Sequence, residues 1–301
     1  MKKQADKIKR VGLIGNSDKA ACADSVRKAA RLIQRAGRKV LCDAGTARLA
    51  GLKNSACGDA AALAHKVDLL LVFGGDGTML HVAREIAGSA TPMLGVNIGG
   101  LGFLTAVPSD EMTRALARVW RGEFKYESRV LIEVSGRCQG RRIHETALND
   151  IVVSRGAVSR LIKLDVSVDG EPVTRYNGDG LIISSPTGST AYSLAAGGAI
   201  VLPTAEVFAL TPVCPHTLSN RPLILPLAST IRVKAISSPP ATILSADGQF
   251  VAELGAGDEV TIRRSRGTVR LMHLADSSFW RRCAASCTGA EPTYERPKAE
   301  G

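Results

Sequence analysis

The first 122 residues alternate short apolar runs with amphipathic stretches that each end at a glycine. Buried strands are predicted at 10–15, 39–42, 67–73 and 93–96, and helices at 19–36, 78–87 and 110–121. The helical stretches repeat apolar residues every three or four positions, whereas the strand runs are almost wholly apolar. Strands that alternate with helices form a parallel sheet covered on both faces, because helical crossovers return the chain in the same direction. We therefore predict an α/β domain here.

From residue 126 the pattern changes to the period of two that half-buried strands require. Asp169-Gly170 and Asp247-Gly248 each fall between two such runs, where a hairpin turn is expected. Only 189–197 has a helical pattern. Strands are predicted at 129–136, 147–154, 160–173, 178–185, 222–225, 230–235, 241–245, 258–263 and 268–273. The expected organisation is an α/β domain over 1–125, a mostly antiparallel β domain over 126–275 and a partly disordered tail over 276–301.

The net charge of +11 is compatible with nucleic acid, an anionic membrane or anionic small molecules as partners. The cations are scattered, with no block of five or six, and aromatic residues suited to base stacking make up only 4% of the chain. No apolar run approaches the ~18 residues that a membrane-spanning helix needs. These observations favour anionic small molecules over nucleic acid or membrane.

The seven cysteines form no CxxC pair and no spacing typical of a zinc site. An odd number of cysteines without a secretion signal indicates reduced thiols. We therefore expect no metal site made of protein ligands alone, and a cytoplasmic location.

The apolar run 67–73 leads directly into Gly74-Gly75-Asp76-Gly77-Thr78. Ligands of open parallel sheets bind beyond the carboxyl ends of the strands, and glycine-rich backbone before a helix presents N–H groups to phosphate. The lysine-bearing loop GxxxxGK[ST] is absent. A carboxylate at a phosphate site is unfavourable unless it accepts a proton or shares a metal ion. The alternative is that Asp76 only caps the following helix, which is worth about 1 kcal/mol.

Two further segments place polar groups in apolar surroundings. Asn149 and Asp150 are adjacent in a predicted strand, so one of them should face the core or a cleft. The alternative is a strand end with both side chains in solvent. Residues 177–198 crowd hydroxyl groups around a strand, a turn and a short helix, and such groups suit ribose and phosphate oxygens.

Together these motifs resemble the NAD kinase family. The resemblance covers roughly 8–275 and rests on GGDGT at 74–78, NIGGLGFLT at 97–105, Asn149-Asp150, GDGLIISSPTGSTAYSLAAGG at 178–198, PHTLSNRPLILP at 215–226 and DGQ at 247–249. It implies a Rossmann-like N-terminal domain of the GGDG kinase type. The implied reaction transfers the γ-phosphoryl group of ATP to the 2′-hydroxyl of the adenosine ribose of NAD. A divalent metal, usually Mg²⁺, and a cytoplasmic homodimer or homotetramer are also implied.

The resemblance assigns roles to individual residues. Asp76 is the expected general base, in a phosphate loop made of Gly74, Gly75, Gly77 and Thr78. The adenosine ribose and base are expected at Asn149 and Asp150. The full set of expected dinucleotide contacts is Asp76, Gly77, Asn149, Asp150, Arg160, Asn177, Asp179, Thr187, Thr190, Ala191, Tyr192, Ser193, Leu194, Ala195 and Gln249.

Three alternatives stay open at the level of sequence: a lipid kinase that shares GGDGT, a regulator that binds nucleotide without catalysis, and a basic nucleic-acid binder. A lipid kinase would need an apolar acceptor groove, which the hydroxyl-rich block disfavours. The choice between NAD and NADH is also open, because Asn177 stands where related enzymes often carry Arg or Gly. So is the choice between ATP and polyphosphate as donor.

Overall fold

The computed structural model describes residues 5–16, 20–52, 55–99, 102–156, 160–216, 221–236, 242–280 and 282–283. Most of the tail expected to be disordered, residues 284–301, lies outside the described residues. So do parts of the NIGGLGFLT and PHTLSNRPLILP motifs, at 100–101 and 217–220. In the described part of the chain, no helix combines the length and the apolar character needed to cross a bilayer.

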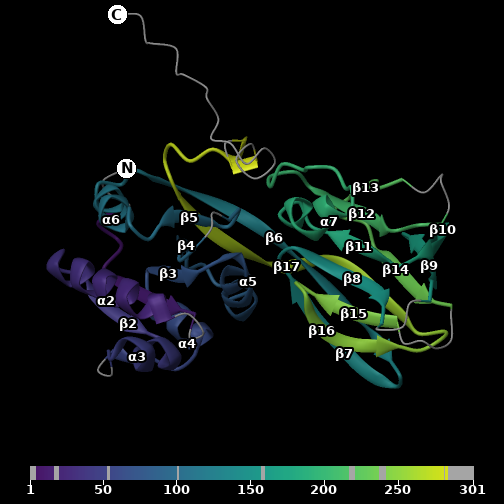
Figure 1. The fold of residues 1–301 in the computed structure, drawn as a ribbon, viewed down its shortest axis with the longest axis horizontal. Coiled ribbons are helices and arrows are strands. Elements are labelled where there is room, and N and C mark those ends of the chain that lie inside the picture. Colours follow the sequence, from purple (N-terminus) through teal and green to yellow (C-terminus); the bar gives the residue numbers. More distant parts are fainter. Residues whose placement is uncertain are drawn as a thin grey trace, which may run out of the picture.

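The N-terminal part is a parallel sheet with helices on both faces, as predicted (Figure 1). Its elements are β1 (Arg10–Gly15), α2 (Ala20–Arg35), β2 (Lys39–Cys42), α3 (Ala44–Ala50), α4 (Ala60–Ala64), β3 (Leu69–Gly74), α5 (Asp76–Glu85), β4 (Met93–Asn97), β5 (Thr105–Pro108) and α6 (Met112–Trp120). The strands pair in the order β2, β1, β3, β4, β5, all in parallel. The short elements α3, α4 and β5 were not predicted.

Strand β3 shows why its sequence is apolar throughout. Leu69, Leu71 and Phe73 join the core cluster under α2 and α6, whereas Leu70 and Val72 join the cluster under α4 and α5. All five side chains are fully buried. Successive strand residues point to opposite faces, so a strand covered on both sides has no place for a polar residue until it ends.

The C-terminal part is built from antiparallel strands, again as predicted. Its elements are β6 (Phe124–Cys138), β7 (Arg141–Ala147), β8 (Asp150–Arg155), β9 (Ile162–Val168), β10 (Glu171–Gly178), β11 (Gly180–Ser184), the 3₁₀ helix η2 (Gly188–Thr190), α7 (Tyr192–Ala195), β12 (Val207–Val213), β13 (Leu223–Pro226), β14 (Ile231–Ala235), β15 (Thr242–Ala246), β16 (Gln249–Leu254) and β17 (Glu259–Leu274). Both predicted hairpin turns form, with Asp169 and Asp247 in the left-handed region at φ 53° and 48°.

The structure differs from the sequence prediction in three strands that were not expected, β7, β12 and β16, and in the last strand. The strands predicted at 258–263 and 268–273 are one strand, β17, with an irregularity in its pairing to β6 between Arg264 and Thr268. A β-bulge interrupts the alternation of side chains, so a single bent strand reads in sequence as two.

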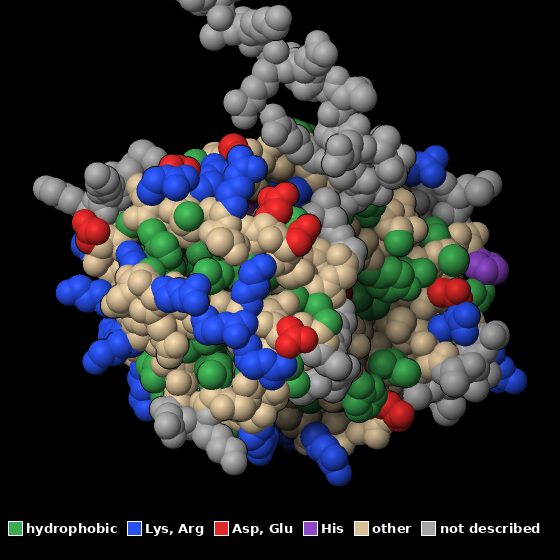
Figure 2. All heavy atoms as spheres, turned by 60° about the vertical axis from the view of Figure 1, so that its left-hand side comes forward, with side chains coloured by type: hydrophobic (Ala, Val, Ile, Leu, Met, Phe, Trp, Pro, Cys, Tyr) green, Lys and Arg blue, Asp and Glu red, His purple; other side chains and the backbone are tan. Residues whose placement is uncertain are grey.

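Strands β6 and β17 connect the two parts of the molecule (Figure 1). In the described residues, eleven strands form one sheet, because β17 pairs both with β14 and β6 and, at Leu271, in parallel with Met93 of β4. A second sheet of six strands has the order β13, β12, β11, β8, β15, β16. Helix α5 follows β3, a strand of the first sheet, whereas β8 is a strand of the second sheet. On the face drawn in Figure 2, Lys and Arg side chains are dispersed with Asp and Glu among them.

Candidate active site

Asp76 is the first residue of α5, directly after β3 and its glycine pair. The N-cap is Gly75, which makes no side-chain cap bond, so the interpretation of Asp76 as a simple helix cap is wrong. Its carboxylate instead leaves the helix and accepts hydrogen bonds from a neighbouring loop. Oδ2 accepts from the Phe103 N–H at 2.8 Å, and Oδ1 accepts from the N–H groups of Leu104 at 3.1 Å and Thr105 at 3.3 Å.

A glycine makes this contact possible. A Cβ at Gly102 would lie 2.2 Å from Oδ1 of Asp76, closer than any real side chain allows. A side chain at 102 would therefore displace the Asp76 carboxylate from its place against the loop. Three convergent N–H donors fix the orientation of the carboxylate.

The carboxylate lines a small cavity, here called the central cavity, of about 120 Å³. It lies where the loop after β3 faces the second sheet. The described residues that line it are Asp76, Phe103, Leu104, Arg129, Asn149, Thr187, Thr190, Ala191 and Phe279. Five of these were predicted from sequence, and Phe103, Leu104, Arg129 and Phe279 were not. The volume suits a ribose or a phosphate but is smaller than a whole nucleotide needs.

The Asn149-Asp150 pair is held by Asp247, the turn residue before β16. The Asp247 carboxylate is fully buried and accepts hydrogen bonds from the backbone N–H groups of Leu148 at 3.0 Å, Asn149 at 2.7 Å and Asp150 at 3.3 Å. Arg84 of α5 lies 3.5 Å from the same carboxylate and also donates to the Ala246 carbonyl. Asp247 thus ties the pair to the helix that begins with Asp76.

Asp150 is buried, with 4% of its surface exposed, so the alternative of a solvated strand end is wrong for this residue. Burial, and secondarily the Asp247 carboxylate, raise the pKa of Asp150 to about 7. Burial likewise raises the pKa of Asp247, against the lowering effect of its hydrogen bonds and of Arg84. Within the described residues, no hydrogen bond or ion pair reaches the Asp150 carboxylate. A buried polar group without a protein partner is typical of a ligand-binding position.

The other predicted contacts do not line the central cavity. The Ser193 hydroxyl is buried and lies 2.9 Å from the Thr211 hydroxyl, where it braces α7. Asp179 pairs with Arg155 at 2.9 Å. The Asn177 Oδ1 is buried without a hydrogen-bond partner in the protein. Tyr192, Ala195, Arg160 and Gln249 are exposed, and Leu194 is half-buried.

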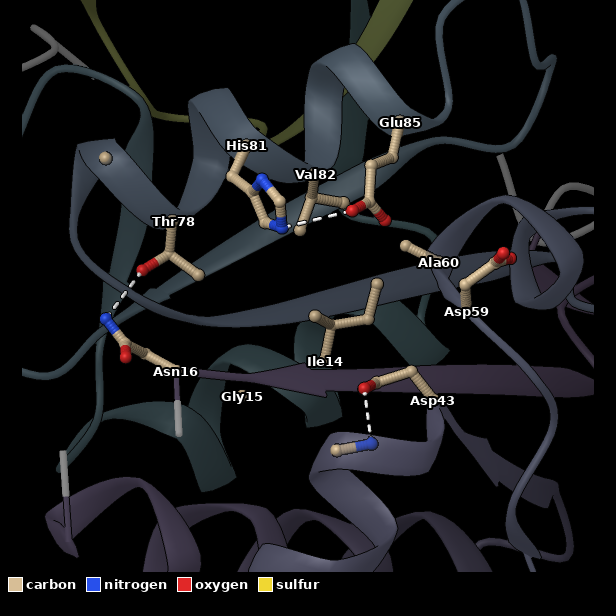
Figure 3. Close-up of a pocket in the computed structure, with 12 residues that line it drawn as sticks. Ile14, Gly15, Asn16, Asp43, Asp59, Ala60, Thr78, His81, Val82 and Glu85 are labelled. Carbon is tan, nitrogen blue, oxygen red and sulfur yellow. Dashed lines mark hydrogen bonds and ion pairs between the residues drawn. The ribbon is translucent and has the colours of Figure 1, made fainter. Parts of the chain in front are cut away.

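A second and larger depression, here called the N-terminal pocket, has a volume of about 440 Å³ (Figure 3). It lies at the carboxyl ends of β1 and β2, and its described lining is Ile14, Gly15, Asn16, Asp43, Gly45, Asp59, Ala60, Gly77, Thr78, His81, Val82 and Glu85. Only Gly77 and Thr78 were predicted. In Figure 3 the Asn16 amide reaches the Thr78 hydroxyl, at 3.2 Å, and His81 faces Glu85 across one helical turn, at 3.1 Å.

The described residues contain no group of three or more His, Cys, Asp or Glu side chains that could hold a metal ion. One oxygen of each of the Asp43 and Asp59 carboxylates caps α3 or α4, and the Oδ1 of Asp43 is buried without a hydrogen-bond partner. A hard cation such as Mg²⁺ can bind through one or two carboxylates when substrate phosphates supply the other ligands. The side chains present fit a metal that arrives with a nucleotide.

Two family models match most of the chain. Residues 11–124 match the ATP-NAD kinase N-terminal domain, and residues 148–274 match the ATP-NAD kinase C-terminal domain. An NAD kinase of Moorella thermoacetica is 38% identical over 273 residues, which cover 91% of this chain and 87% of the relative. An NAD kinase of Thiobacillus denitrificans is 39% identical over 271 residues, which cover 90% and 93%.

Solved structures agree with the sequence relatives. The crystal structure of yeast NADH kinase complexed with NADH superimposes with a TM-score of 0.82 at 29% identity and covers 97% of this chain and 90% of that one. An NAD kinase from Archaeoglobus fulgidus in complex with ATP has the same fold, with a TM-score of 0.71 at 24% identity over 90% and 96% of the chains. These matches favour neither the lipid-kinase alternative nor the non-catalytic regulator.

Proposed function

This chain belongs to the NAD kinase family and is a phosphotransferase that makes NADP from NAD and ATP, and we propose that Asp76 is the general base of the transfer. One observation carries the proposal. The Asp76 carboxylate is oriented by three N–H groups into a cavity that it shares with Asn149, Thr187 and Thr190 of the C-terminal part. A base must lie within hydrogen-bond reach of the proton that it removes, and this cavity is large enough to hold a ribose beside it.

In the proposed step, the 2′-hydroxyl of the adenosine ribose gives its proton to Asp76 as its oxygen bonds to the γ-phosphorus of ATP. The bond from the γ-phosphorus to the β,γ-bridging oxygen breaks, and ADP leaves with that oxygen. A ribose hydroxyl is a weak nucleophile, so a positioned carboxylate should contribute about 10²- to 10⁴-fold. The rest of the acceleration comes from positioning and from neutralisation of the phosphate charge.

The acceptor site is proposed to run from the central cavity outward. Asp150 has a buried carboxylate with no protein partner, and it sits next to Asn149, so the two suit hydroxyl and amino donors of adenosine. Thr187, Thr190 and Ala191 form the wall of the cavity. The rest of the dinucleotide extends beyond 120 Å³ of space, over residues predicted from sequence: Gly77, Arg160, Asn177, Asp179, Tyr192, Ser193, Leu194, Ala195 and Gln249.

The N-terminal pocket is proposed to hold the nucleoside of ATP, with the phosphates over the loop Gly74, Gly75, Gly77 and Thr78. This pocket has the volume of a nucleotide site and borders the first turn of α5, which is ten residues long. Its lining includes carboxylates that repel phosphate but accept hydrogen bonds from ribose hydroxyls. A divalent metal, Mg²⁺ in the simplest case, would enter on the ATP phosphates.

Other features of the enzyme also stand as proposals. The six cysteines in the described residues are free thiols, which supports a cytoplasmic location. Exposed apolar side chains such as Leu202, Ile224 and Phe250 support assembly into a homodimer or homotetramer. The family-model ranges support domains over 1–125 and 126–275. Asn177 leaves both NAD and NADH as acceptors to be compared.

Replacement of Asp76 by Asn tests the base directly. Asn keeps one acceptor oxygen for the loop N–H groups, so we expect the protein to fold with a loss of about 1 to 2 kcal/mol in stability and with little change in the NAD dissociation constant, while turnover falls about 10²-fold or more. Turnover is measured with ATP, Mg²⁺ and NAD in an assay coupled to an NADP-dependent dehydrogenase. The exposed Asp24→Asn is the matched control. Unchanged turnover in Asp76→Asn would reduce Asp76 to a tie between α5 and the loop at 103–105.

A further inference from the structure

Arg129 of β6 is the one Lys or Arg among the described residues that line the central cavity. It is almost completely buried, with 3% of its surface exposed. One terminal nitrogen lies 3.0 Å from the Glu127 carboxylate, and the other donates to the Thr187 hydroxyl at 3.3 Å. Its Nε has no hydrogen-bond partner in the protein. A buried guanidinium with an unused donor at the wall of a cavity points to an anionic ligand.

The carboxylates of Glu127 and Asp76 lie near the guanidinium groups behind the cavity. Of the described residues, Arg129 and Arg282 bring guanidinium groups to this place, and both interact electrostatically with Glu127. Arg282 also interacts with Asp76. His273, 1% exposed, adds no charge at neutral pH, because burial lowers its pKa to about 3 although Glu127 lies 3.4 Å away.

The proposed reaction changes this balance. When Asp76 takes the ribose proton, its negative charge is lost, and Glu127 is left as the carboxylate that interacts with both guanidinium groups. In the same step the ribose oxygen gains a phosphoryl group, which brings new negative charge into the same cavity. Arginine presents a planar fork of donors that matches phosphate oxygens. The surplus positive charge therefore appears where and when the phosphate does.

We propose that Arg129 binds the phosphoryl group as it reaches the 2′-oxygen, and then holds the 2′-phosphate of NADP. The inference rests on the proposed function, because it needs the adenosine ribose to lie in the central cavity beside Asp76. It adds a residue that the sequence motifs did not single out. It also predicts that Arg129 distinguishes the product from the substrate, since NADP and NAD differ only by this phosphate.

The experiment compares the two dinucleotides in the absence of ATP. Dissociation constants of NAD and NADP are measured by calorimetry for the wild type and for Arg129→Met. Loss of one charge-assisted phosphate contact should weaken NADP about 10- to 100-fold and change NAD by less than about threefold. Arg118→Met is the matched control, because Arg118 is also largely buried, 17% exposed, and ion-paired with Glu123 and Asp276, but does not line the cavity. It should change neither constant.

A second variant shows whether an effect of Arg129→Met comes from misfolding. Arg129→Lys keeps the charge but not the fork, so it should fold and still weaken NADP several-fold more than NAD. Equal weakening of NAD and NADP in the Arg129 variants would show a structural role and overturn the inference, and so would no weakening at all. Asn149→Ala separates the two proposals, because the proposed function expects it to weaken NAD and NADP alike. If Asn149→Ala changed neither, the placement of the ribose, and the inference with it, would be wrong.

Discussion

Two clusters of ionisable groups adjoin residues that line the central cavity, and one is acidic whereas the other is basic. The acidic cluster is Asp150 and Asp247, with Arg84 as the nearby cation. The basic cluster is Arg129, Arg282 and His273, with Glu127 as the nearby anion. Carboxylates accept hydrogen bonds from hydroxyl and amino groups, whereas guanidinium groups bind phosphate. The acidic cluster therefore suits the hydroxyl groups of a ribose, and the basic cluster suits a phosphoryl group that the ribose receives.

Neither cluster is arranged for maximum stability. Burial disfavours the charged form of each group, so the pKa values of the acids rise and that of His273 falls. The two clusters should therefore respond to pH in opposite directions. The free energy of unfolding, measured on variants of each cluster, tests this expected difference.

The largest effect is expected at Asp247. In Asp247→Asn one of the two acceptor oxygens becomes an N–H₂ group, which faces backbone N–H donors that were previously satisfied. We expect a loss of about 3 kcal/mol in the free energy of unfolding and weaker NAD binding, because Asn149 and Asp150 lose their anchor. Urea unfolding and calorimetry measure the two effects.

Asp258→Asn is the matched control for this variant. The Asp258 carboxylate also accepts from two backbone N–H groups, those of Gln139 and Gly255, both at 2.8 Å, but it lies away from both cavities. It should lose about 1 kcal/mol and keep its NAD affinity. Similar NAD affinities in the two variants would contradict a positioning role for Asp247.

The next effect is the acid sensitivity that His273 confers. Its pKa is about 3 in the folded protein and about 6.5 when unfolded, so between these values the unfolded chain binds more protons. The contribution of His273 to the free energy of unfolding is fully present above pH 6.5 and is lost as the pH falls toward 3. Between pH 7 and pH 5 the wild type should lose about 2 kcal/mol more than His273→Phe in urea unfolding. Parallel pH profiles would show that His273 is not buried in its neutral form.

The smallest of the three effects is the opposite response of Asp150. Its pKa is raised to about 7, so its contribution to stability is complete at low pH and is lost as the pH rises through 7. Between pH 6 and pH 8 the stability of Asp150→Asn relative to the wild type should rise by about 1 to 2 kcal/mol, while its NAD affinity is lower than that of the wild type. A constant stability difference from pH 4 to pH 8 would mean that Asp150 is ionised throughout.

Much of the fold followed from local patterns in the sequence. The strand at Arg10–Gly15 and the strand at Lys39–Cys42 were predicted with the bounds that the structure has, because apolar runs between glycines and charges are unambiguous. The elements that were missed are short or irregular. Helix α4 has five residues, too few for a helical period to be recognised, and the bulge in β17 made one strand look like two.

The site was predicted in part for the same reason. Asp76, Asn149 and Thr187 stand out because each is a polar residue in a local context that does not explain it. Asp247 stood out only as a turn residue and as part of DGQ at 247–249, not as the anchor of Asn149. Arg129 and Phe279 do not stand out, because an arginine in a strand and an aromatic residue near the C-terminus are both ordinary locally. Their roles depend on what lies across the cavity from them.

From the sequence alone came the longer strands and helices of the N-terminal part, the change from parallel to antiparallel pairing, the glycine-rich loop at 74–78 and the family. These depend on residue periodicity and on motifs of a few consecutive residues. The hold of the N–H groups at 103–105 on Asp76, the anchoring of Asn149 by Asp247 and the place of Arg129 in the same cavity as Asp76 are visible only in the folded protein. Hydrogen bonds and buried ion pairs join residues that are distant along the chain, and a local sequence pattern does not show which of these residues are in contact.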